Sequence, residues 1–304
     1  MIVELTKNIK VIRPEAKSAF PYSNSLYIDD DIQTMIDAGA GKAYKEIAAE
    51  NIDLVLISHN HFDHINGLPY FTKARIFAGR EETLTYTDPQ VYLEFSGFSR
   101  WEELMGQKKV GNMNALYQMP DDVPSQIGFQ PISLTGVFKD GDEFNLGRTM
   151  VKTIHTPGHT PGHYSFYIEK EGILFSGDID MSPRGPWYGN EYSDLDELID
   201  SVQRIKDIKP RILVTSHRRI FYHDINQRLD EFINTVMDKE EQILEYLIEP
   251  RTLDDIAAQD FAYENELRNR YIVFWAKIMI EKHLKRLARL NKIEKIGLDK
   301  YIKI

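Results

Sequence analysis

The 304-residue chain contains no cysteine. Disulfide bonds and thiolate ligands are therefore excluded, and any metal ion must be held by nitrogen and oxygen atoms. Long hydrophobic runs are also missing: the densest, residues 271–280, is interrupted by Lys277 and is about half as long as a bilayer span requires. The first residues lack the apolar segment of a signal peptide. Together these absences predict a cytoplasmic protein without a membrane segment.

Positive charge is scarce over most of the chain and concentrated at its C-terminal end. The net charge is −10, but residues 271–304 hold nine Lys or Arg against three acidic residues, a net of +6 that leaves −16 on the other 270. An acidic main body disfavours nucleic-acid binding, because the phosphate backbone attracts basic surfaces. The basic C-terminal segment keeps RNA binding open.

The apolar pattern predicts a mixture of strands and helices. Short β-branched and aromatic runs bounded by turn residues indicate strands within residues 9–14, 25–40, 53–58, 130–138, 148–159, 164–178 and 210–217. Helical spacing is seen in residues 41–52, 194–208, 225–249 and 271–291. Residues 252–259 open with Thr252, a predicted helix cap with Asp255 three residues later, and residues 292–304 are typical of a small hairpin.

Four candidate metal ligands are crowded into HNHFDH, residues 59–64. His59 and His61 alternate by two, so on an extended backbone they face the same way, and Asp63 and His64 follow at a turn. Imidazole nitrogens and a carboxylate suit Zn²⁺, and also Fe or Mn. Three of the nine histidines of the chain lie in these six positions, which argues against a coincidental polar loop.

This motif resembles the HxHxDH signature of the metallo-β-lactamase superfamily, and three further motifs follow in the family's order. HTPGHTPGH contains His159, FSGD contains Asp178 and LVTSH contains His217. The resemblance covers roughly residues 1–240. It implies an α+β fold, a four-layer αββα sandwich with the site at one edge of two packed sheets. We predict a catalytic domain over residues 1–240, followed by a helical, winged-helix-like module over residues 241–304.

The same resemblance implies a metal-dependent hydrolase with two metal ions, either two Zn²⁺ or, alternatively, Fe or Mn. The ligands it implies are His59, His61 and His159 for one ion, Asp63, His64 and His217 for the other, and Asp178 bridging both. Asp63 and His64 would thereby belong to the catalytic machinery. A hydroxide bridging the ions would attack the substrate carbonyl. His155 and His163 are expected to support the site rather than to bind metal.

Three residues near these motifs are expected to contact substrate. Arg218 stands where the family commonly has a small residue after the last ligand, and it suits a carboxylate or phosphate; a solvated arginine, like Arg219, is the alternative. Trp187 and Tyr188 lie on a predicted loop after Asp178, which favours an organic substrate. For His223, both a position in the cleft and a plain surface position stay open.

Residues 80–128 are predicted to form an insertion of short helices. Its aromatic residues, either a cap over the metal edge or a satellite core or dimer interface, are Tyr86, Tyr92, Phe95, Phe98, Trp101 and Tyr117.

Three functions compete at this stage. Hydrolysis of an ester or thioester (acyl-CoA or a glutathione thioester, as in glyoxalase II-like enzymes) is favoured, with a small-molecule acyl substrate as partner. The alternatives are a phosphodiesterase or endoribonuclease of the same fold, and a metal-binding effector with little turnover. Formation of a homodimer is left open.

Overall fold

The computed structural model describes residues 1–108, 118–259, 261 and 269–304. Its first β-sheet has seven strands that lie side by side in sequence order. The strands are β1 (Ile2–Glu4), β2 (Ile9–Ile12), β3 (Ser25–Ile28), β4 (Thr34–Ile36), β5 (Leu54–Ile57), β6 (Arg75–Gly79) and β7 (Gly136–Phe138). Pairing is antiparallel from β1 to β4 and parallel from β4 to β7.

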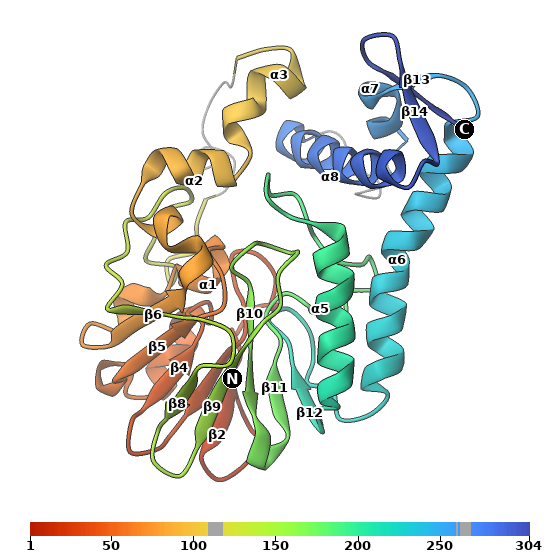
Figure 1. Ribbon diagram of the computed structural model, residues 1–304. Coiled ribbons are helices and arrows are strands. Elements are labelled where there is room, and N and C mark those ends of the chain that lie inside the picture. Colours follow the sequence, from red (N-terminus) through yellow and green to blue (C-terminus); the bar gives the residue numbers. More distant parts are fainter. Residues whose placement is uncertain (109–117, 260, 262–268) are drawn as a thin grey trace.

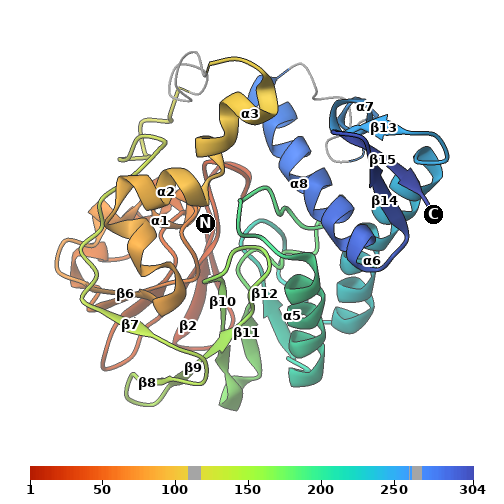
Figure 2. The same ribbon diagram turned by 45° about the horizontal axis from the view of Figure 1, so that its top comes forward.

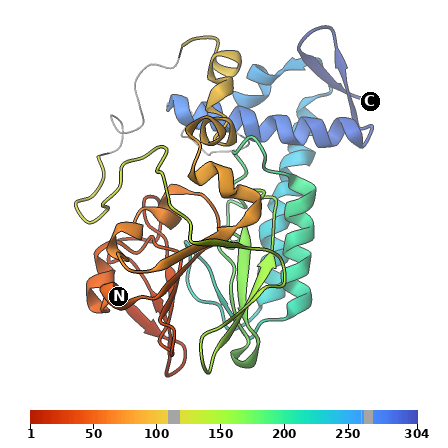
Figure 3. The ribbon, with the colours of Figure 1, turned by 60° about the vertical axis from the view of Figure 1, so that its left-hand side comes forward.

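A second sheet of five strands, ordered β12-β11-β10-β9-β8, packs face to face against the first (Figure 3). Its strands are β8 (Glu143–Asn145), β9 (Met150–His155), β10 (Tyr164–Ile168), β11 (Ile173–Phe175) and β12 (Ile212–Val214). Both sheets send apolar side chains into one shared core, for example Leu26 and Ile36 from the first and Phe166 and Phe175 from the second. This burial is the main force that holds the layers together.

Helices cover the outer face of the second sheet. There α5 (Leu195–Ile208) and α6 (Ile225–Tyr246) run side by side (Figure 1). Asp194 caps α5 by accepting hydrogen bonds from the next turn, and Leu198 and Val202 are buried against the sheet. The predicted arrangement of two packed sheets with helices outside them is confirmed.

The outer face of the first sheet is covered mainly by short helical turns. The helical segment predicted over residues 41–52 forms two short 3₁₀ helices, Gly41–Glu46 and Ala49–Asn51, instead of one continuous helix. Buried Tyr44 bonds through its hydroxyl to Ser25 and to the Ala40 amide. Anchoring to the sheet therefore decides the local backbone here. The strand predicted over residues 130–138 is limited to β7.

Short helices form within the predicted insertion, residues 80–128. They are η4 (Arg80–Tyr86), α2 (Pro89–Phe95), η5 (Phe98–Arg100) and α3 (Trp101–Met105). Tyr117, which we counted among the insertion's aromatic residues, lies outside the described residues.

The C-terminal region combines helices with a three-stranded sheet, ordered β13-β15-β14. Its elements are β13 (Arg251–Thr252), α7 (Leu253–Ala257), α8 (Arg270–Arg289), β14 (Ile293–Ile296) and β15 (Lys300–Lys303). The capping box of Thr252 and Asp255 is present, and the predicted hairpin is confirmed. Helix α6 continues through residue 240, where we placed the domain boundary.

Helix α8 crosses the edge of the sandwich instead of standing apart from it (Figures 1 and 2). Its Phe274 ring stacks on Phe98 at 5.4 Å between centroids, and its Glu281 pairs with Arg100 at 2.8 Å. The C-terminal helix therefore packs against the insertion. Among the described residues, no helix is long and apolar enough to cross a membrane.

Candidate metal centre

The candidate ligands follow the ends of strands at one edge of the two sheets. His59 comes two residues after β5, and His61 immediately precedes helix α1 (Phe62–Ile65), which carries Asp63 and His64. From the second sheet, His159 follows β9, Asp178 follows β11 and His217 follows β12. Parallel strands bring their carboxyl ends to the same edge, where α/β proteins build sites.

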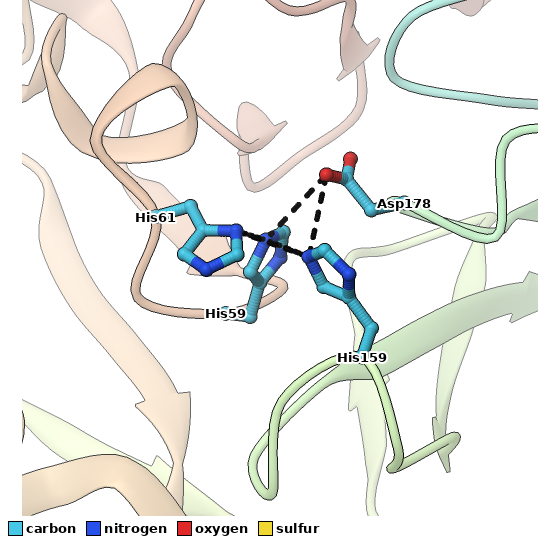
Figure 4. A group of neighbouring side chains, drawn as sticks. All are labelled: His59, His61, His159 and Asp178. Atoms are coloured by element: carbon cyan, nitrogen blue, oxygen red, sulfur yellow. Dashed lines mark hydrogen bonds and ion pairs between the residues drawn. The ribbon is translucent and has the colours of Figure 1, made fainter. Parts of the chain in front are cut away.

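One group of four side chains points toward a common centre (Figure 4). His59 Nε2 and His61 Nδ1 are 2.9 Å apart, and His159 Nε2 lies 3.2 Å from the former and 3.0 Å from the latter. Asp178 Oδ2 lies 3.4 Å from His159 Nε2.

A second group contains Asp63, His64 and His217. His217 Nε2 lies 3.3 Å from Asp63 Oδ2. The second oxygen of Asp178, Oδ1, lies 3.1 Å from His64 Nε2 and 3.2 Å from His217 Nε2. Asp178 therefore faces both groups, one with each carboxylate oxygen.

The donor atoms fit metal ions. In a tetrahedral zinc site with Zn–N bonds of 2.0–2.1 Å, ligand atoms lie about 3.4 Å apart, close to the separations seen here. Apart from the close approaches within the cluster itself, His64 Nε2 and Asp178 Oδ1 are buried without a hydrogen-bond partner among the described residues. Buried polar atoms are rarely left unpaired. This His/Asp cluster is of the kind typical of a dinuclear metal site.

Hydrogen bonds behind the cluster orient the imidazoles. His159 Nδ1 donates to the Trp187 carbonyl oxygen at 2.7 Å, so its Nε2 carries the free lone pair. Asp37 serves two other ligands: it lies 2.7 Å from His64 Nδ1, and it accepts from Ser58 Oγ, which in turn lies 2.9 Å from His59 Nδ1. No sequence motif marked Asp37 or Ser58, because their role depends on contacts with distant strands.

The buried charges shift the acidities within the cluster. Burial lowers the pKa of His59 and of His61, which keeps both imidazoles neutral as metal ligands require. Burial alone would lower the pKa of His217, but Asp178 outweighs it and raises that pKa to about 9. Burial acts to raise the pKa of Asp178, yet the neighbouring His217 and His64 hold it well below its usual range. These pKa shifts favour a negatively charged Asp178 next to a positively charged His217 when no metal ion is bound.

Glu82 joins the two loops that carry the first group of ligands. Its side chain is 2% exposed, Oε2 accepts from the Asn60 N–H and Oε1 accepts from the Gly162 N–H, both at 2.8 Å. Gly162 is required at this point, because a Cβ atom would lie 2.6 Å from Glu82 Cγ. Glu82 was missed by sequence reasoning, since nothing in its local sequence indicates either partner.

The other histidines lie outside the two groups. His163 is buried behind Asp178, whose backbone N–H donates to its Nε2 at 3.1 Å, and burial lowers the pKa of His163 to about 3. His155 donates to the Pro161 carbonyl oxygen. His223 is exposed, and neither it nor His283 lines the cavity described next.

A cavity of about 480 Å³ opens directly in front of the cluster. His61, Asp63, His159, Asp178 and His217 line its floor.

Two of the three predicted substrate contacts line this cavity, namely Trp187 and Arg218. Arg218 donates to Ser182 Oγ at 2.8 Å, and its Nε lies 3.8 Å from Asp180 Oδ2. The prediction for Tyr188 was wrong: its side chain is fully buried and bonds to His283 Nε2 at 2.7 Å, away from the cavity. The hydrogen bond to His283 of α8 holds Tyr188 away from the cavity that its neighbour Trp187 lines.

The aromatic residues of the insertion divide between two roles. Tyr92, Phe95 and Phe98 line the cavity. Tyr86 is buried beside the first sheet and Trp101 is buried against α8. Both interpretations made from the sequence, a cap and a satellite core, therefore hold for different members of the set.

This protein thus combines two packed mixed sheets with a His/Asp cluster at the edge where their strands end, which is the arrangement of a metal-binding protein class. Residues 19–217 match the model of the metallo-β-lactamase superfamily. The chain belongs to this superfamily.

Three relatives show the range of similarity, each between 25% and 28% identical. A beta-lactamase-like protein 2 homolog of Drosophila melanogaster is 25% identical over 87% of this chain and 77% of its own. The human acyl-coenzyme A thioesterase MBLAC2 is 28% identical over 56% of each chain. A hydroxyacylglutathione hydrolase of Francisella tularensis is 26% identical over 62% of this chain and 60% of its own. The alignments with the last two span less than two thirds of those enzymes.

A solved metallo-beta-lactamase family protein from Thermus thermophilus superposes with a TM-score of 0.77. The match covers 99% of this chain and 100% of that one at 20% sequence identity. At this identity, the similarity shows the fold.

Proposed function

We propose that the protein is a dinuclear metal-dependent hydrolase of an ester or thioester. The observation that carries the proposal is a cavity lined by aromatic side chains and with the His/Asp cluster as its floor. The aromatic lining residues are Phe20, Phe62, Tyr92, Phe95, Phe98, Trp187 and Trp275. Such a site binds an organic acyl group and places its carbonyl beside the metal ions. Two distant relatives carry names of thioester hydrolases, an acyl-coenzyme A thioesterase and a hydroxyacylglutathione hydrolase.

The seven clustered residues would hold the ions, His59, His61 and His159 at one and Asp63, His64 and His217 at the other, with Asp178 between them. Two bound Zn²⁺, or Fe or Mn, would supply a nucleophilic water near neutral pH and stabilise charge on the carbonyl oxygen.

The protein's own groups orient and support this chemistry. The bonds from His159 to Trp187 and from His64 to Asp37 fix which imidazole nitrogens face the ions. Trp187 also lines the cavity, with its ring centroid 5.1 Å from that of His61, and would shield one side of the reacting carbonyl from bulk water. Arg218, at the rim, is placed to attract an anionic group of the substrate.

The charges along the cavity favour this reading over a nuclease. Arg218 is the one Lys or Arg among the described lining residues, against three carboxylates. A site for a phosphodiester backbone would carry more cations.

Several cations of the basic C-terminal segment are also engaged within the chain. Arg286 and Arg289 pair with Asp196, Lys282 donates to a backbone carbonyl, and Lys277 pairs with Asp254. We interpret the C-terminal helices and sheet as a winged-helix-type module whose role is to pack on the sandwich and not to bind RNA.

The first test is metal content and hydrolysis by the full chain. We expect up to two transition-metal ions per chain, and His61→Ala should lose most of them, whereas the matched variant His223→Ala, at an exposed site, should keep them. The zinc-loaded wild type should hydrolyse aryl esters, acyl-CoA or glutathione thioesters but not a phosphodiester reporter or RNA.

Three results would contradict the proposal. A folded wild-type protein that cannot be loaded with zinc, iron or manganese would refute the site. Cleavage of RNA alone would replace the proposed ester or thioester hydrolysis with nuclease activity. Full metal binding without turnover on any member of this panel would favour an effector role.

A further inference from the structure

The C-terminal helix α8 forms part of the cavity wall, although in sequence it lies far from the metal ligands. Ile272 and Trp275 of α8 line the cavity beside Phe95 and Phe98 of the insertion. Residues three apart on a helix lie on the same face, so α8 presents both side chains to the cavity together. We refer to these four residues as the outer wall.

The outer wall carries no charge. Among the described lining residues, the charged ones, Asp63, Asp178, Asp180 and Arg218, all come from the segments that carry the metal cluster. An apolar group is favoured against such a wall, and a charged one loses hydration there without gaining a partner.

Aromatic rings connect the metal cluster to this wall. The Trp187 ring centroid lies 5.1 Å from that of His61 and 6.2 Å from that of Trp275. The Phe95 ring lies 6.3 Å from the His61 ring. An acyl group whose carbonyl sits at the cluster can therefore run along continuous apolar surface to the outer wall.

Several contacts hold α8 in this position. Lys282 donates to the Glu191 carbonyl oxygen, and Glu191 in turn bonds through its N–H to the carbonyl oxygen of Phe95, a wall residue. Buried His283 is bonded by Tyr188. These bonds join α8 to the loop after Asp178 and that loop to the insertion, so the two segments that form the outer wall are held together.

We propose that the substrate's acyl group is a medium-length aliphatic chain and that Trp275 and Ile272 of α8 select its length. The inference rests on the proposed function and deepens it. The C-terminal helix would thus act as a specificity element of the active site.

The test compares acetate and octanoate p-nitrophenyl esters with zinc-loaded full-length protein. Trp275→Ala should lower kcat/KM for octanoate by about tenfold or more, since each methylene that loses apolar contact changes kcat/KM roughly fourfold. The acetate ester is too short to reach the wall, so its kcat/KM should change less than about threefold. Trp275→Phe should restore most of the octanoate preference.

Val273→Ala is the matched control, because Val273 is half-buried on the same helix and does not line the cavity. It should leave the octanoate-to-acetate ratio unchanged. Equal losses for both esters in Trp275→Ala, or no loss in either, would overturn the inference.

A binding measurement separates this inference from the proposed function. Calorimetric titration with octanoate requires no turnover, and Trp275→Ala should weaken octanoate binding about tenfold relative to the wild type. If no ester or thioester is hydrolysed but octanoate binds in this Trp275-dependent way, the proposed function fails and binding of an acyl chain at the outer wall is supported. If esters are hydrolysed but octanoate binds the wild type and Trp275→Ala equally, the role assigned to the outer wall is refuted and the proposed hydrolase function is kept.

Discussion

Replacing Glu82 with glutamine removes one of two buried acceptors that join the metal loops. In the native protein its carboxylate accepts from the Asn60 and Gly162 N–H groups, each at 2.8 Å. Glutamine keeps one oxygen and places an NH₂ group against the other N–H. Because a buried donor left without a partner costs about 1–3 kcal/mol, we expect Glu82→Gln to lower the free energy of unfolding by about 1–3 kcal/mol.

Alanine removes both acceptors, so Glu82→Ala should cost roughly twice as much. Metal binding should respond as well, since the two loops carry His59, His61 and His159. Changes to groups that support metal ligands commonly reduce metal affinity by about 10–100-fold, and we expect a loss in that range for Glu82→Gln.

Two assays check this reasoning. Urea unfolding of the metal-free protein measures the loss of stability, and competition with a chromophoric chelator measures zinc affinity. Glu50→Gln, at an exposed position, is the control and should match the wild type in both. A Glu82→Gln variant with wild-type urea midpoint and wild-type zinc affinity would refute the role assigned to this carboxylate.

Three smaller predictions concern the C-terminal region. Tyr188→Phe leaves His283 Nε2 without its partner, so thermal unfolding should show a loss of about 1–3 kcal/mol, with KM unchanged because Tyr188 does not line the cavity. Thr252→Ala removes the capping box of α7 and should cost about 1 kcal/mol in the same assay, whereas Thr252→Ser should cost little. Burial acts to raise the pKa of Glu240, but the nearby His283, at 3.5 Å, and a hydrogen bond from Arg286 outweigh it and lower that pKa. A carboxyl with a lowered folded-state pKa contributes stability above its unfolded value of 4.5, and that contribution is lost as the pH falls below it. The gap in urea stability between the wild type and Glu240→Gln should therefore be full at pH 7 and narrow below pH 4.5; a gap independent of pH would contradict this assignment.

Local patterns determined much of the fold. The helical spacing of residues 194–208 and the Thr252 cap produced the predicted elements, because each depends on neighbours within a few residues. The helical stretch at residues 41–52 is divided into two short 3₁₀ helices, where Tyr44 is anchored to Ser25 and Ala40.

The candidate ligands could be chosen from the sequence for two reasons. His59, His61, Asp63 and His64 lie within six positions, and the later motifs follow in the order of the superfamily. Chemistry limits such positions to a few residue types, so they are visible without a structure. Their convergence on one edge was expected from strand ends and is seen in the two groups.

The surroundings of that centre were decided only by tertiary structure. Asp37, Glu82 and Trp275 reach the site from strands and helices far away in sequence, and ordinary residue types at such positions carry no local signal. Tyr188 shows the same limit from the other side, because the position of α8 with His283 turns its side chain away from the cavity. The sequence by itself determined the candidate metal ligands at this edge, whereas packing of distant segments decided what shapes the space above them.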